Sequence, residues 1–271
     1  MRIRALVIAA ASGAVAVSAL AVPAAQAAPT AAPAVTFSGV SVNGGKAVVV
    51  GPTTKVTVKV TYTIKKPASL NINKVAHGPV LYRGSTLSET SPSIFGDEAG
   101  TCTASSSTVL KCSAKLQFRP KSAGDFDDLD NGQAGAWKVG ALAIATDASS
   151  ADDIKWAGNL GTAKVLRQGK LTVNATPEPV KKGKTLTVTG KLSRANWDSN
   201  AYAGYAGQSV KLQFRKKGSS TYTTVKTVKT GSTGNLKTTV KASADGYYRY
   251  SFAGTSTTAP VSAAADFVDV K

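Results

Sequence analysis

Few residues in this chain have the side chains that acid–base, nucleophilic or redox chemistry needs. Among its 271 residues there is one histidine, His77, and there are two cysteines, Cys102 and Cys112. No G-x-S-x-G nucleophile elbow occurs, and a lone histidine is typical of a surface or hydrogen-bonded structural residue. The 15 acidic residues leave a paired-carboxylate glycosidase as the one catalytic type still open. We therefore predict a non-enzymatic protein and assign no catalytic residue.

The two cysteines are expected to form a disulfide. Cys102 and Cys112 are ten positions apart, and the Ser/Thr-rich segment between them runs into an alternating strand. In an exported chain such a pair is read as a crosslinked hairpin rather than as a redox or metal site. Closing a loop of this size restricts the unfolded chain by roughly 3 kcal/mol on the entropic account of disulfide stabilisation.

An aspartate-rich run is the candidate metal site. Its four carboxylates are followed by Asn131 and Gly132, and oxygen ligands of this kind suit a hard cation such as calcium. The spacing does not fit an EF-hand, and an acidic turn needs no metal. The residues of this calcium hypothesis are Asp125, Asp127, Asp128 and Asp130.

A long loop, residues 195–205, is rich in aromatic residues. Trp197, Tyr202 and Tyr205 alternate there with Asn and Asp, a composition that could stack on a carbohydrate. The alternative, which we favour, is that these aromatics fold back and plug the end of a sandwich.

The N-terminus predicts export. Arg2 and Arg4 precede the apolar segment Ala5–Val22, and Ala25–Ala27 has the A-x-A pattern of a signal peptidase site. We expect residues 1–27 to be a cleaved signal peptide, leaving an extracellular protein without a membrane anchor.

The mature chain alternates apolar and polar residues with a period of two almost throughout. The clearest case is Lys55–Lys65, where valines, Tyr62 and Ile64 share one face and Lys and Thr the other. Short intervals between Gly, Pro, Asn and Ser clusters then predict an all-β protein built of antiparallel β-sandwiches. A polar break near Gly169 divides it, so we expect a disordered leader at 28–34 and domains at 35–168 and 169–271.

Charge is distributed unevenly between these domains. The whole chain carries a formal +18, of which residues 28–168 contribute +5 and residues 169–271 contribute +11. Strand parity places four cations on outward faces, where they could attract a polyanion: Lys211, Arg215, Lys237 and Lys241. The predominance of Lys over Arg favours the alternative, that they keep the sandwich soluble and block edge pairing.

The second half also carries a family resemblance. The stretches Pro177–Gly190, Gly204–Arg215 and Gly246–Phe252 resemble the C-terminal immunoglobulin-like module of secreted actinobacterial proteins, over roughly residues 170–271. The resemblance implies two tandem immunoglobulin-like sandwiches and no established activity, although some such proteins carry a calcium-binding label. It provides no catalytic residue.

The sequence therefore predicts a secreted, non-enzymatic binding or structural protein. Its expected partner is an anionic polymer of the cell envelope or matrix. Calcium binding at 125–130 and carbohydrate binding at 195–205 are the alternatives, and calcium is the only cofactor considered. Nucleic acid is not expected, because the basic strands show no interleaved aromatics.

Overall fold

The structure is a computed structural model, and it describes residues 31–121, 128–148 and 150–271. The predicted signal peptide and residues 28–30 of the predicted leader lie outside these ranges. Within them, no helix has the length and apolar character required to cross a membrane.

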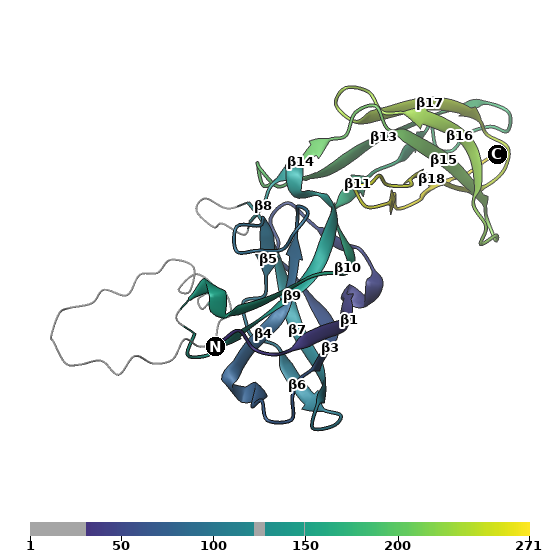
Figure 1. Ribbon diagram of the computed structural model, residues 1–271. Helices are drawn as coiled ribbons and strands as arrows, with labels where there is room; N and C mark the ends of the chain where they lie inside the picture. Colours follow the sequence, from purple (N-terminus) through teal and green to yellow (C-terminus); the bar gives the residue numbers. More distant parts are fainter. Residues whose placement is uncertain (1–30, 122–127, 149) are drawn as a thin grey trace, which may run out of the picture.

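The predicted all-β class is confirmed. The strands form two bodies, drawn from purple to teal and from green to yellow in Figure 1. The first body contains β1 (Thr36–Val42), β2 (Val48–Val50), β3 (Val56–Lys65), β4 (Val75–Tyr82), β5 (Ser93–Phe95), β6 (Thr101–Ala104), β7 (Val109–Pro120), β8 (Asp128–Leu129), β9 (Gly135–Ala145) and β10 (Ile154–Arg167). The second contains β11 (Gly169–Leu171), β12 (Asn174–Thr176), β13 (Thr185–Asn196), β14 (Ala201–Gly204), β15 (Ser209–Lys216), β16 (Thr223–Lys229), β17 (Asn235–Lys241), β18 (Gly246–Phe252), β19 (Val261–Ser262) and β20 (Asp266–Val268). Short 3-10 turns lie at Asn43–Gly45, Ile72–Lys74, Asn131–Gln133 and Ala151–Asp153.

The first body is a sandwich of two sheets. One sheet has the order β1-β3-β7-β6, with β8 added beside β7, and the other has the order β2-β10-β9-β4-β5. Pairing is antiparallel except for β2 with β10 and β7 with β8, which are parallel. The alternation expected for β3 is present, because Val58, Val60, Tyr62 and Ile64 are buried in the core between the sheets.

Strand β4 was not expected from the sequence, and its surroundings explain why. All eight of its residues are buried, so it shows no alternation between an apolar and a polar face. One face of its sheet meets the main core, and the other supports a second cluster that includes Tyr82, Leu87 and Leu142.

The second body is also a sandwich of two sheets. Its first sheet is organised around the long strand β13, which pairs with β11, β12, β14 and β17. Its second sheet has the order β16-β15-β18-β19, with β20 also paired to β18. Residues 169–176 form two short strands rather than one, because β11 pairs with residues 192–194 of β13 and β12 with residues 187–189.

The two bodies are joined by continuous, hydrogen-bonded backbone. Only Gln168 separates β10 from β11. Its N–H donates to the carbonyl of Val50 in the first body, and its carbonyl accepts from the N–H of Ala195 in the second. The buried Arg167 guanidinium donates to the carbonyl of Ala195. The connection is therefore held on both sides rather than free.

Candidate functional site

The structure corrects the carbohydrate hypothesis for the loop at 195–205. Trp197 is fully buried, and it belongs to the core of the first sandwich although its chain segment comes from the second. Its indole N–H donates to the carbonyl of Val50. A ring enclosed in this way has no face left for a sugar. The loop aromatic does plug a sandwich end, but the end that it closes is that of the neighbouring domain.

The other two aromatic residues of the loop each make their own contacts, apart from Trp197. Tyr202 donates its hydroxyl to Gln168, and its ring lies 4.7 Å from the Lys170 ammonium. The ring of Tyr205 lies under the Arg194 guanidinium at 3.9 Å and meets Phe252 edge-on. These contacts do not combine the three aromatics into one stacking platform.

Only part of the aspartate run can be placed. Asp125 and Asp127 lie outside the described residues, as does the side chain of Asp128. The Asp130 carboxylate accepts from the backbone N–H groups of Gly132 and Gln133, so it caps the 3-10 turn that follows. The calcium hypothesis stays a prediction of the sequence, with one of its four carboxylates engaged in a helix cap.

The four basic residues lie on two different sheets. Lys211 and Arg215 lie on β15, whereas Lys237 and Lys241 lie on β17, and these strands belong to different sheets of the second sandwich. Because the outer faces of a sandwich point in opposite directions, the four cations cannot act on one ligand surface. Strand parity gave the direction of each side chain relative to its own sheet but not which strands share a sheet.

On the β15 side, the outward residues form a layer of cations and aromatic rings. Neighbouring pairs across β15 and β18 are Lys211 with Ser251, Gln213 with Arg249, and Arg215 with Tyr247. These side chains point outward because the intervening residues Val210, Leu212, Tyr248 and Tyr250 are buried. We call Lys211, Arg215, Arg249, Tyr222 and Tyr247 the stacked cation face.

The rings of this face hold its guanidinium groups in place. Arg249 lies 3.7 Å from the centre of the Tyr222 ring, and Arg215 lies 5.3 Å from the same ring and 4.1 Å from that of Tyr247. Arg249 also donates to the Gln213 side chain, and Arg215 to the carbonyl of Ser219. These aromatics could not be assigned to the face from the sequence, because Tyr222 lies before β16 and Tyr247 lies on β18, so they meet the basic strand only across the sheet.

Neither guanidinium has an acidic partner among the residues that the structure describes. In the part of the chain that the structure describes, the ion pairs are Arg119 with Asp97, Lys217 with Asp245, and Lys271 with Asp269. Arg215 and Arg249 are in none of them. Stacking fixes the planes of these two groups while most of their N–H donors remain for an external acceptor.

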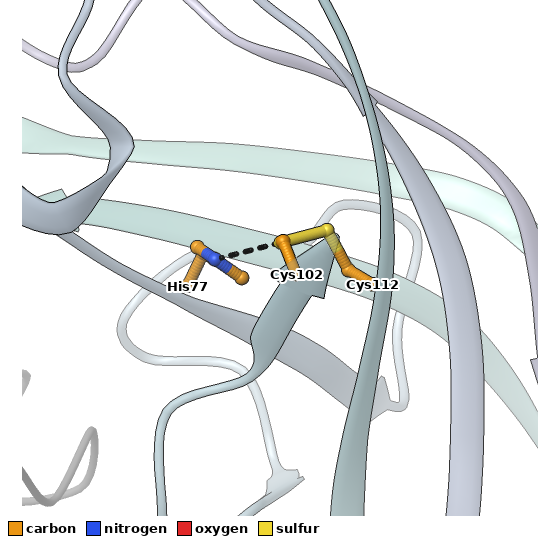
Figure 2. Close-up of side chains that lie close together, drawn as sticks. All are labelled: His77, Cys102 and Cys112. Atoms are coloured by element: carbon orange, nitrogen blue, oxygen red, sulfur yellow. Dashed lines mark hydrogen bonds between the residues drawn. A yellow bond between two sulfur atoms is a disulfide. The ribbon is translucent and has the colours of Figure 1, made fainter. Parts of the chain in front are cut away.

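A second cluster lies in the first sandwich, where the predicted disulfide is confirmed. Cys102 on β6 and Cys112 on β7 are directly opposite each other and bonded at 2.03 Å. Figure 2 shows His77 of β4 beside them, with its Nε2 atom 3.3 Å from the Cys102 sulfur. His77 is 3% exposed, and its Nδ1 atom lies 2.8 Å from the Tyr62 hydroxyl.

Proton positions in this cluster follow from the disulfide. A disulfide sulfur carries no hydrogen, so the Nε2–Sγ contact is a hydrogen bond only if Nε2 is the donor. Nδ1 then accepts from the Tyr62 hydroxyl. Burial lowers the pKa of His77 to about 4 and raises that of Tyr62, which keeps both groups neutral at physiological pH.

Comparison with known proteins gives only weak likenesses. No protein-family model matches the chain, and no curated protein matches it. Among solved structures, the D00-D0 domain of Intimin is 16% identical with a TM-score of 0.26, covering 85% of this chain and 99% of that one. The Escherichia coli adhesin FdeC is 13% identical with a TM-score of 0.32, covering 89% and 67%. Tandem Ig repeats of Dlar are 12% identical with a TM-score of 0.23, covering 89% and 99%.

Proposed function

We propose that this protein is an exported binding protein whose second domain associates with anionic polymers of the cell envelope or extracellular matrix. The observation that carries the proposal is the stacked cation face. Arg215 and Arg249 are fixed against Tyr222 without a carboxylate partner in the described chain. Because Tyr222 and Tyr247 already fix the two guanidinium planes, less side-chain freedom is lost when an anion binds there than at lysines that stack on no ring, which favours this face over the other basic surfaces.

The spacing of the face suits a polymer. Lys211, Arg249 and Arg215 lie on three successive outward rows of the paired strands. Rows on one face of a sheet repeat about every 7 Å, because side chains alternate and each residue rises about 3.4 Å. A chain with one anionic group at a similar interval, such as a phosphodiester or uronate polymer, would meet one cation per row.

The test compares two surfaces that lose equal charge. The full-length mature protein and two variants are applied to immobilised teichoic acid and eluted with salt. We expect Arg215→Gln with Arg249→Gln to elute at markedly lower salt than the wild type, because the fixed guanidinium pair is lost. The matched variant, Lys237→Gln with Lys241→Gln on the opposite sheet, should elute close to the wild type. Equal losses by both variants would show that only net charge matters and would refute a dedicated face.

A further inference from the structure

The ligand atoms of His77, Cys102 and Cys112 converge from three strands. The histidine nitrogen and the two sulfurs all lie within 4.8 Å of one another. They come from both sheets of the first sandwich, since β4 belongs to one and β6 and β7 to the other. One imidazole and two sulfurs are a donor set that zinc accepts in proteins, provided that the sulfurs are thiolates.

We propose that reduction of the Cys102–Cys112 disulfide converts this cluster into a Cys₂His site for a borderline-soft divalent cation, with Zn²⁺ as the fitting ion. A dithiol reductant supplies two electrons and two protons, so that two cysteine thiols form and the reductant becomes a disulfide. When the cation binds, both thiol protons pass to solvent and the thiolates become ligands. The oxidised form has no thiolate and does not bind the cation.

One distance in the cluster, that between Nε2 of His77 and the Cys102 sulfur, is already close to the value in a tetrahedral site. With Zn–S bonds of ~2.3 Å and a Zn–N bond of ~2.1 Å, tetrahedral angles put the two sulfurs about 3.8 Å apart and each sulfur about 3.6 Å from the nitrogen. Nε2 already lies 3.3 Å from the Cys102 sulfur. Once the covalent bond is broken, the two sulfurs must separate to non-bonded contact, which moves them toward the required spacing.

Tyr62 can orient the histidine in both redox states. In the oxidised state its hydroxyl donates to Nδ1, as the disulfide contact requires. A metal would need the Nε2 lone pair, so the ring proton would move to Nδ1 and the same hydroxyl would accept it. Histidine ligands commonly donate their second N–H to an acceptor in this way. The Tyr62 hydroxyl can therefore satisfy Nδ1 in both redox states.

The surrounding chain leaves room for this arrangement. A Cβ at Gly100 would lie 1.9 Å from the Tyr62 hydroxyl and 3.2 Å from His77 Cε1, so glycine is needed there. The Gly100 N–H also donates to the carbonyl of His77 at 2.7 Å. A pocket of about 390 Å³ lined by His77 and Cys102 gives solvent a path to the cluster and space for water as a fourth ligand.

Charge balance favours a divalent cation. Two thiolates and a neutral imidazole carry a charge of −2, so a dication makes the buried cluster neutral overall. The Tyr62 hydroxyl, which contacts the second ring nitrogen of His77, adds no charge to the cluster. A neutral cluster avoids the large cost of leaving an uncompensated charge in a buried position.

The experiment uses the full-length mature protein, reduced with a phosphine under anaerobic conditions and freed of reductant. Co²⁺ serves as the spectroscopic probe for the zinc site. We expect one equivalent of Co²⁺ to give thiolate-to-cobalt charge-transfer bands with tetrahedral d–d bands, and Zn²⁺ to abolish them. The oxidised protein should give neither. Tyr62→Phe should weaken Co²⁺ binding about 10-fold to 100-fold, the usual effect of losing an outer-shell partner.

Folding of the reduced protein is followed in parallel by near-ultraviolet circular dichroism and thermal melting. Zn²⁺ should raise the melting temperature of the reduced protein and leave that of the oxidised protein unchanged. A folded, reduced protein without thiolate bands would overturn the proposal, and so would equal bands in His77→Gln. A reduced protein that is unfolded and stays unfolded with Zn²⁺ would overturn it as well.

Discussion

At the scale of single residues, His77 is a buried polar group whose ring is held on both sides. It is 3% exposed, and its two ring nitrogens are engaged by the Tyr62 hydroxyl and the Cys102 sulfur. Neither neighbour is charged, so nothing in direct contact compensates an imidazolium. This explains why burial dominates and lowers the pKa of His77 from 6.5 to about 4.

This shift predicts a pH dependence of stability. Between pH of about 6.5 and about 4 the unfolded chain binds a proton on His77 that the folded chain does not bind. The free energy of unfolding should therefore fall as the pH falls through that window, by up to about 3 kcal/mol at ~1.4 kcal/mol per pKa unit. Above the window, His77 should contribute no pH dependence.

Urea unfolding of the oxidised protein at a series of pH values measures this effect. His77→Gln is the reference, because carboxylates that titrate in the same range contribute equally to both proteins and cancel in the difference. The wild type should lose more stability than the variant on acidification. Parallel stability curves for the two proteins would contradict a buried neutral His77.

At the scale of elements, β13 organises the second sandwich. Its first half pairs with β12 and β17, and its second half pairs with β11 and β14. Gly190 lies where the partner on one side changes. A Cβ there would lie 2.3 Å from the carbonyl oxygen of Thr172 and 2.8 Å from the Tyr250 ring. The Tyr250 hydroxyl in turn donates to the carbonyl of Val188.

We predict that Gly190→Ala destabilises the second sandwich by about 1–3 kcal/mol, the range for overpacking a filled site. Backbone and a buried ring both oppose the added methyl group, so neither neighbour can move freely. Thermal unfolding followed by tyrosine fluorescence is the measurement. Gly231→Ala is the control, because the nearest atom to a Cβ there is 3.7 Å away. Equal melting temperatures for the two variants would show that the site can relax.

Whether a strand could be predicted from the sequence depends on whether one of its faces is exposed to solvent. Strand β3 faces solvent on one side, so its alternation was readable, and the fold class followed from such strands. Strand β4 is buried on both faces and gave no such signal. The disulfide was predictable because its residues are close in the sequence. The stacked cation face was not, because Tyr222 and Tyr247 meet Arg215, and Arg249 meets Tyr222, only through the pairing of strands.

At the scale of the whole molecule, the junction couples the two sandwiches. The side chain of Asn131, from the first, contacts three consecutive residues of the second: it donates to the side chains of Asn196 and Asp198 and accepts from the Trp197 N–H. Arg167 is buried beside them, and burial followed by the charge of Arg194 lowers its pKa to about 10. We therefore expect the two domains to hold one relative orientation in solution.

Trp197 is the residue on which this coupling should depend most. It is covalently part of the second domain but fills the core of the first, so Trp197→Ala opens a cavity and removes the plug together. A buried Trp→Ala change costs about 3–5 kcal/mol. We expect the wild type to unfold in a single thermal transition and Trp197→Ala to unfold in two, with the first domain melting earlier. The radius of gyration by solution scattering should increase in the variant.

The control is Trp156→Ala, which removes a partly buried tryptophan of the first domain from the cluster near Phe95, away from the junction. It should lower the melting temperature while the transition stays single and the radius of gyration stays unchanged, because the contacts of Asn131 and Trp197 remain. If Trp197→Ala keeps one transition and the wild-type radius, the junction does not depend on the plug. If Trp156→Ala splits the transition and raises the radius of gyration as much as Trp197→Ala does, loss of stability in the first domain alone explains both changes. The relative orientation of the domains would then depend on an intact core of the first domain and not on the Trp197 side chain itself.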